Sequence, residues 1–168
     1  MPKPIVQDGN KVLREKAKPV PASMFGGAEL KKIIADMSAS LATCDDGIAL
    51  AGPQIGVSYR IFIVSGKLWT DEGEKKIKPD VVFINPKIIK KSKKMVTLDE
   101  GCLSVRWQYG KTKRADKASV EAQEIDGKKI TWHGSGLLAQ IFQHETDHLD
   151  GILFTDHAVD LEEIHPIE

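Results

Sequence analysis

The pentapeptide His144-Glu145-Thr146-Asp147-His148 constrains the fold and chemistry of this chain more than any other feature. A helix advances about 100° per residue, so two histidines four positions apart lie on one face and can bind one ion. Glu145 lies one step round the helix, where its carboxylate can take a proton from a water activated by that ion. The pattern predicts a helix with two metal ligands and a base. The alternative is an exposed amphipathic helix with two solvated histidines.

The residues around the pentapeptide favour an inward-facing helix. Ser135 is the predicted N-cap, and Gly151 is the predicted end of the helix. Apolar residues recur between them at the spacing of a core-facing helix: Leu137, Leu138, Ile141, Phe142 and Leu149. Two inward histidines without a metal would be costly to satisfy.

A protein-held metal needs at least a third ligand, and the downstream candidates fit poorly. The third histidine of a metzincin would fall at Phe154, and His157 comes three residues too late. A gluzincin takes a glutamate from a second helix, but only Glu162, Glu163 and Glu168 follow. Neither zinc-protease pattern is complete.

Cysteine is the remaining candidate ligand. Cys44 closes a predicted amphipathic helix over residues 28–45 and is interpreted as a small core residue. Cys102 follows a strand-like segment and Gly101, which lets the backbone turn closely past another group. The residues alone leave Cys102 open as a metal ligand or a structural residue.

Three segments together resemble the signature motifs of the peptide deformylase family. They are Gly47-Ile48-Ala49-Leu50-Ala51-Gly52-Pro53-Gln54, Glu100-Gly101-Cys102-Leu103-Ser104 and the stretch from Gln143 to Gly151. Their order and separations match the family, and the likeness extends from about residue 5 to about residue 157.

The resemblance implies a metal-dependent hydrolysis that removes the N-formyl group from the initiator methionine of new polypeptides and releases formate. By this resemblance Cys102, His144 and His148 ligate one divalent metal, and Glu145 is the general base and then the acid. The side-chain amide of Gln54 and the backbone N–H of Leu103 would bind the oxyanion. The implied physiological ion is Fe(II). Zn(II), Ni(II) or Co(II) would also suit one thiolate and two imidazoles.

The resemblance also suggests where substrate binds. The expected substrate-binding residues are Gly47, Ile48, Ala49, Glu100 and Gly101. Leu98, Leu137 and Ile141 are candidates for the methionine side-chain pocket, with ordinary core residues as the alternative.

Some positions depart from the family pattern. Ala49 replaces a family glycine, Gly52 replaces an alanine, and Arg106-Trp107 follows Val105 where proline is common. Two other functions therefore stay open: a general zinc peptidase, and a metal-binding relative that serves as a binding module without catalysis.

The 168 residues, 41% of them hydrophobic, fit one domain over residues 1–168 with a short C-terminal tail from about residue 158. Within that tail, residues 159–164 could form a turn or two of helix. No signal peptide, transit peptide or membrane span is visible, which favours a cytoplasmic, bacterial-type protein.

Charge patterning says little about nucleic acid. The 24 basic and 24 acidic residues balance, so bulk electrostatics give no case for a DNA partner. A basic run is interpreted as a solvated strand edge, with a transient contact to ribosomal RNA as the alternative: Lys87, Lys90, Lys91, Lys93 and Lys94.

The expected fold is α+β, with antiparallel sheets packed around a central buried helix that carries the HExxH motif, and an additional N-terminal helix. Asp126-Gly127 predicts a hairpin turn, and residues 67–79 an exposed loop. The predicted strands cover residues 60–65, 81–85, 87–91, 95–99, 119–125 and 129–133.

Overall fold

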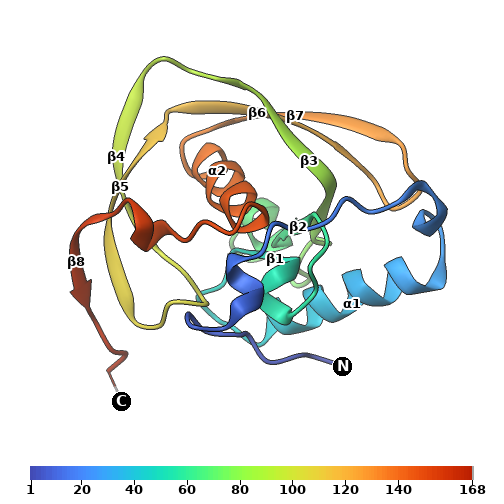
Figure 1. The fold of residues 1–168 in the computed structure, drawn as a ribbon, viewed down its shortest axis with the longest axis horizontal. Helices are drawn as coiled ribbons and strands as arrows, with labels where there is room; N and C mark the ends of the chain where they lie inside the picture. The colour runs from blue at the N-terminus through green and yellow to red at the C-terminus, as the bar shows by residue number, and fades with distance from the viewer. Residues whose placement is uncertain (168) are drawn as a thin grey trace.

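The computed structural model describes residues 1–167 and has the predicted α+β architecture, with its strands in two antiparallel sheets (Figure 1). The larger sheet has the order β1-β2-β3-β6-β7, and its strands are Ala49–Ala51, Ile61–Val64, Val81–Lys91, Lys117–Gln123 and Lys129–Ser135. The smaller sheet has the order β4-β5-β8, and its strands are Met95–Gly101, Gln108–Ala115 and Val159–Glu163. Short 3-10 helices connect the elements: η1 Lys11–Arg14, η2 Ala22–Met24, η3 Gly52–Ile55, η4 Gly66–Trp69 and η5 Phe154–Asp156.

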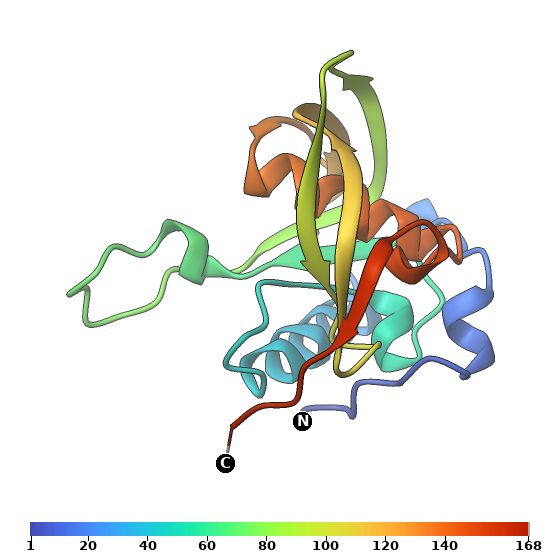
Figure 2. The ribbon, with the colours of Figure 1, turned by 90° about the vertical axis from the view of Figure 1, so that its left-hand side faces the viewer.

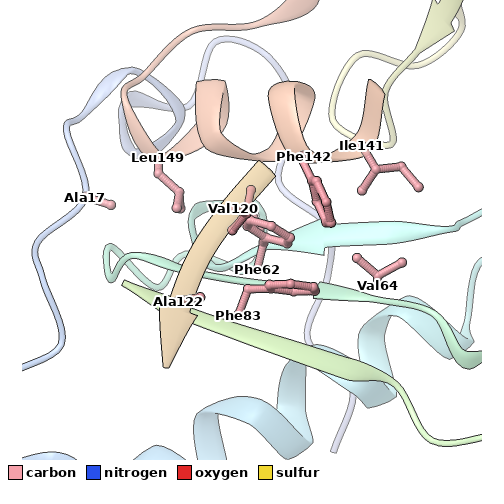
Figure 3. Close-up of a cluster of buried hydrophobic side chains, with 10 residues drawn as sticks. Ala17, Phe62, Val64, Phe83, Val120, Ala122, Ile141, Phe142 and Leu149 are labelled. Carbon is pink, nitrogen blue, oxygen red and sulfur yellow. The ribbon is translucent and has the colours of Figure 1, made fainter. Parts of the chain in front are cut away.

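The motif helix α2, Leu137–Leu149, lies between the two sheets (Figure 1). Its apolar face packs on the larger sheet, where Phe142 points at Phe62 and Phe83 (Figure 3). Phe62 and Phe83 stack with ring centroids 4.7 Å apart, and Phe142 meets Phe83 edge-to-face at 5.4 Å. Each fully buried phenylalanine contributes about 1.5–3 kcal/mol. The packing of these three rings therefore fixes the position of α2 on the sheet and its rotation about its own axis. Both determine the direction in which its histidines point.

The other face of the larger sheet is covered by α1, Ala28–Ala42. Successive residues of a strand point to opposite faces, so Phe62 and Val64 face α2 while Ile61 and Ile63 face α1. All four side chains are fully buried. The apolar face predicted for this helix is confirmed, although the helix ends at Ala42 instead of residue 45.

Several local predictions need correction. Ser135 is not an N-cap, because β7 continues through it and Gly136, with φ of 57°, makes the turn into α2. The strands predicted at 81–85 and 87–91 are one strand, β3, with an irregular register between Ile84 and Lys87.

The helical turn predicted in the tail is also wrong, because residues 159–163 form the edge strand β8, which pairs with β5. The Asp126-Gly127 hairpin between β6 and β7 is confirmed, with Gly127 at φ of 91°. Gly151, at φ of 75°, follows the end of α2 as expected.

The connection between β2 and β3 extends away from the body of the molecule (Figure 2). Its residues 71–79 are all exposed, as the sequence predicts, but residues 67–70 of the predicted loop are half-buried, because η4 packs Leu68 and Trp69 against the core. Among the described helices, none combines the length and apolarity that crossing a bilayer requires.

Candidate metal centre and active-site cleft

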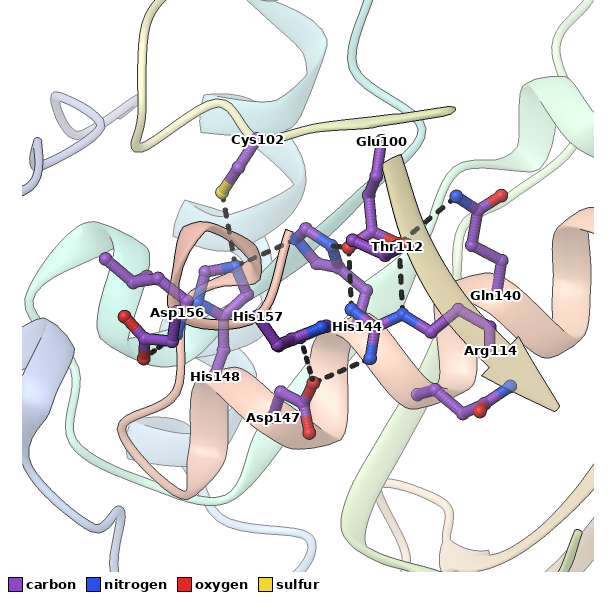
Figure 4. A network of polar contacts seen from close by, with 12 residues as sticks. Glu100, Cys102, Thr112, Arg114, Gln140, His144, Asp147, His148, Asp156 and His157 are labelled. Atoms are coloured by element: carbon purple, nitrogen blue, oxygen red, sulfur yellow. Dashed lines mark hydrogen bonds and ion pairs between the residues drawn. The ribbon is translucent and has the colours of Figure 1, made fainter. Parts of the chain in front are cut away.

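Two elements bring three metal-binding side chains together. Cys102 follows the end of β4, and His144 and His148 lie one turn apart on the inner face of α2 (Figure 4). The Sγ of Cys102 is 3.3 Å from Nε2 of His148, which is 3.1 Å from Nε2 of His144. All three ligand atoms lie within 4.8 Å of one another. The predicted ligands therefore converge on one position.

The donor set fits a transition-metal cation. A sulfur and two imidazole nitrogens at these separations can all reach one ion at about 2.0–2.3 Å. Burial lowers the pKa of His144, but hydrogen bonding to Cys102 and to Glu100 raises it well above the usual value. In the metal-free site these neighbours therefore favour a second proton on the His144 ring, and a bound metal cation would have to displace it.

Glu100 orients the first histidine. Its Oε2 accepts a hydrogen bond of 3.0 Å from Nδ1 of His144. Burial raises the pKa of Glu100, but hydrogen bonds from His144 and Arg114 lower it by more. The net pKa lies well below the usual value of a glutamate, so the carboxyl stays ionised. Because an ionised carboxylate only accepts, Nδ1 of His144 carries a proton, and in the neutral, metal-binding form of the ring the Nε2 lone pair faces the cluster.

Arg114 holds Glu100 from the other side and links it to α2 (Figure 4). Its Nε and Nη2 donate to the two oxygens of Glu100 at 3.1 and 2.6 Å, and its Nη1 donates to Asp147 at 2.7 Å. The side chains of Arg114 and Glu100 are only 6% and 3% exposed. Charges this deeply buried require partners. Arg114 was not predicted from the sequence. It points inward from β5, and the residues of this strand show no apolar alternation that would have indicated a strand.

Glu145 is buried beside the cluster, at 2% exposure. Its Oε2 has no hydrogen-bond partner within residues 1–167. Burial raises the pKa of Glu145 to about 7. A carboxylate with a free oxygen and a pKa near neutrality is suited to accept and return a proton.

The side-chain amide of Gln54 is held in one orientation. Its Oε1 accepts from the backbone N–H of Ala51 at 2.9 Å, which leaves Nε2 to donate to Oγ of Ser104 at 3.1 Å and toward Sγ of Cys102 at 3.6 Å. Gln54 is 1% exposed. Ser104, which the sequence analysis did not single out, thus lies beside both Gln54 and a metal-binding residue.

A cavity of about 330 Å³ opens over Cys102, His144 and Glu145. Its other lining residues include most of the expected ones: Gly47, Ile48, Ala49, Gln54, Glu100, Gly101, Leu103, Leu137 and Ile141. Leu98, expected in the methionine pocket, is half-buried on β4 and does not line the cavity. Residues not expected there are Asp46, Asp99, Arg106, Tyr109 and Gln140.

Of the departures from the family pattern, Ala49 and Arg106 line this cavity, whereas Gly52 and Trp107 do not. Arg106 pairs with Asp46 through two hydrogen bonds of 2.6 and 3.2 Å across the rim. Gly52 lies where an added Cβ would come within 2.8 Å of the carbonyl oxygen of Val57, so this backbone approach requires glycine. The structure therefore explains the departures at Arg106 and Gly52, and neither disturbs the three metal-binding side chains.

A cluster of one sulfur and two imidazoles, with a buried carboxylate beside it and a cavity above it, defines the class: a metal-dependent hydrolase. The profile of the polypeptide deformylase family matches residues 2–163. Peptide deformylase 2 of Clostridium acetobutylicum is 41% identical over 147 residues, which are 88% of this chain and 89% of that protein. The Halothermothrix orenii peptide deformylase is 42% identical over 155 residues, 90% of each protein.

Solved structures agree with the sequence comparison. The Acinetobacter baumannii class I type b peptide deformylase bound to Met-Ala-Ser has a TM-score of 0.83 at 31% identity, over 94% of this chain and 99% of that one. The Thermotoga maritima enzyme has a TM-score of 0.80 at 33% identity, over 94% and 98%. This chain belongs to the peptide deformylase family. Its activity is the removal of the N-formyl group from nascent peptides.

Proposed function

We propose that deformylation takes place at the Cys102–His144–His148 cluster, with Glu145 as the group that moves the proton. The observation that carries this proposal is the buried, unpartnered Oε2 of Glu145, a residue that lines the same cavity as the ligands Cys102 and His144. Hydrolysis at neutral pH needs an activated water and a stabilised oxyanion, and the residues around the cavity can provide for both.

Cys102, His144 and His148 would hold one divalent ion. Such an ion, when bound, acts as a Lewis acid and lowers the pKa of water to about 7. We assign Fe(II) as the physiological ion on the family resemblance, since the ligand set equally suits Zn(II), Ni(II) and Co(II). Elemental analysis of protein purified without oxygen tests this assignment.

Glu145 takes the proton from the attacking water and delivers it to the leaving amine. The formamide C–N bond then breaks, the new C–O bond makes formate, and the protonated nitrogen becomes the free amino terminus. Because Glu145 is buried, bulk solvent does not compete for this proton.

Gln54 and the backbone N–H of Leu103 stabilise the negative charge on the former carbonyl oxygen. The backbone N–H of Ala51 donates to Oε1 of Gln54, so Nε2 of Gln54 points toward Ser104 and Cys102. A donor of this kind contributes about 3 kcal/mol to the transition state.

The cavity walls position the peptide. We assign the backbone of the substrate to the segments containing Gly47, Ile48, Ala49 and Gly101, and the methionine side chain to the wall with Leu137 and Ile141. Glu100, expected at the substrate, instead has its carboxylate engaged by His144 and Arg114, so we assign it to the support of the cluster.

We propose transient association with ribosomes in the cytoplasm, where formylated nascent chains emerge. The support is a run of four exposed lysines at the end of β3 and in the β3–β4 connection, of which Lys94 also pairs with Asp116 at 3.8 Å: Lys90, Lys91, Lys93 and Lys94. Cosedimentation with ribosomes, compared between this protein and a variant with these four lysines changed to glutamate, tests the association.

Formate release from a formyl-Met peptide, measured beside cleavage of the same peptide without the formyl group, tests the function. We expect formate from the first substrate and no cleavage of the second. Cleavage of the unformylated peptide would favour a general peptidase.

A further inference from the structure

We infer that residues 5–8, the N-terminal strap, position the two oxyanion donors, and that Gln7 is the positioning residue of this strap. The inference rests on the proposed roles of Gln54 and Leu103. Neither donor belongs to a long regular element: Gln54 lies in the four-residue η3, and Leu103 lies in the turn between β4 and β5. Their positions therefore depend on tertiary contacts.

The side chain of Gln7 holds the turn that carries Leu103. Its Nε2 donates to the carbonyl oxygen of Leu103 at 2.8 Å, and its Oε1 accepts from the backbone N–H of Arg106 at 3.2 Å. One amide thus bonds both sides of the turn that follows the metal-binding Cys102.

The backbone of the strap contacts both donor segments in succession. The N–H of Val6 donates to the carbonyl oxygen of Gln54 at 2.9 Å, and the N–H of Asp8 donates to that of Ser104 at 2.7 Å. Ser104 in turn accepts from the Gln54 amide. Residues 6, 7 and 8 therefore connect η3 to the turn, and fix the Gln54 amide relative to the Leu103 N–H.

Gln7 itself is exposed, so burial does not explain its two hydrogen bonds to the turn, beside a longer one of 3.5 Å to the carbonyl oxygen of Ile5 within the strap. Water can replace an exposed partner, so the loss of these hydrogen bonds lowers the stability of the fold only slightly. The same loss frees the peptide group between Leu103 and Ser104 to rotate, although its N–H donates to Sγ of Cys102 at 3.4 Å, and so loosens the turn that carries the Leu103 N–H. Displacement of a reacting group by about 1 Å can cost about 100-fold in rate, so even a partial displacement affects kcat.

The test uses the full-length, metal-loaded enzyme and the variant Gln7→Met, which keeps the side-chain length and removes both hydrogen bonds. We expect kcat for a formyl-Met peptide to fall about tenfold, below the 10²–10³ typical of a lost donor. We expect KM, metal content and melting temperature to stay close to those of the unmodified protein. Gln7→Glu keeps the acceptor for Arg106 but places an oxygen against the Leu103 carbonyl, so its kcat should fall at least as far.

Ser40→Ala is the matched control. Oγ of Ser40 accepts from the N–H of Lys3 at 2.8 Å and donates to its carbonyl at 2.9 Å, so it ties the same N-terminal chain to α1 instead of the turn. We expect this variant to lose stability and keep kcat. An equal loss of kcat in Ser40→Ala would overturn the inference, because general tethering would then explain the effect.

Gln54→Met separates the inference from the proposed function. If kcat falls by about 10²–10³ in Gln54→Met but is unchanged in Gln7→Met and Gln7→Glu, the strap has no positioning role and the oxyanion assignment stands. If Gln54→Met keeps the normal kcat, the oxyanion assignment fails and the inference fails with it.

Discussion

Replacement of Glu100 by glutamine should weaken metal binding strongly, although the two side chains have the same shape. Every partner of the Glu100 carboxylate donates. His144 and Arg114 donate to Oε2, while Arg114, Thr112 and Gln140 donate to Oε1. Because Arg114 donates to both oxygens, the NH₂ group of a glutamine would face an N–H of Arg114 in either orientation.

The magnitude follows from burial. The Glu100 and Arg114 side chains are 3% and 6% exposed, and loss of one partner of a buried ion pair typically costs about 3–5 kcal/mol. Asp147 still pairs with Arg114, so the lower end of that range applies to folding of the metal-free protein. Loss of a carboxylate that orients a ligating histidine typically weakens metal affinity about 10–100-fold.

The assay is a competition titration with a chromophoric chelator on Glu100→Gln and the unmodified protein, with urea unfolding of both metal-free forms. Asp99→Asn is a matched control, because Asp99 is the neighbouring carboxylate on β4 and its side chain is 87% exposed, with Lys111 as its partner. An unchanged metal affinity in Glu100→Gln would refute the claim that Glu100 orients His144. Equal losses in both variants would do the same.

Three further predictions concern the proton carrier, the rim and acid stability. Glu145→Gln should keep one metal per chain by elemental analysis and lose about 10²–10⁴ in kcat; normal turnover would remove Glu145 from the mechanism. Arg106→Met, which breaks the tie to Asp46 across the rim, should raise KM about fivefold at constant kcat, the equivalent of about 1 kcal/mol; an altered kcat at constant KM would contradict this role. The depressed pKa of Glu100 stabilises the metal-free fold above its unfolded value of 4.5, and this contribution is lost as pH falls through the lower folded pKa. Urea unfolding between pH 5 and pH 2 should therefore show a steeper loss for the unmodified protein than for Glu100→Gln.

The strongest parts of the fold were predictable because their patterns are local. The apolar spacing before His144 predicts an inward-facing helix, and the structure places Phe142 in the core and both histidines at the cluster. Asp126-Gly127 marks its hairpin for the same reason. The joining of Cys102 to the histidines came from the family resemblance, because a contact across more than forty residues leaves no periodic signal.

The missed strands lack the pattern that defines a half-buried strand. The inner face of β5 carries Gly110, Thr112 and Arg114, which are polar or small, so the strand shows no apolar alternation. Every residue of β8 is exposed, so its sequence carries no burial pattern at all and was misinterpreted as helical. The hydrogen bonds of Gln7 and Arg114 near the site could not be predicted from the sequence either. They form between segments far apart in the chain and depend on which elements become neighbours in the fold.

X-ray absorption spectroscopy of the metal in anaerobically purified protein shows whether one sulfur and two imidazole nitrogens bind a single cation. We expect one ion per chain, with one sulfur at about 2.3 Å and two nitrogens at about 2.0–2.1 Å, and loss of the sulfur signal in Cys102→Ser. A spectrum without sulfur in the unmodified protein, or one unchanged by Cys102→Ser, would contradict it.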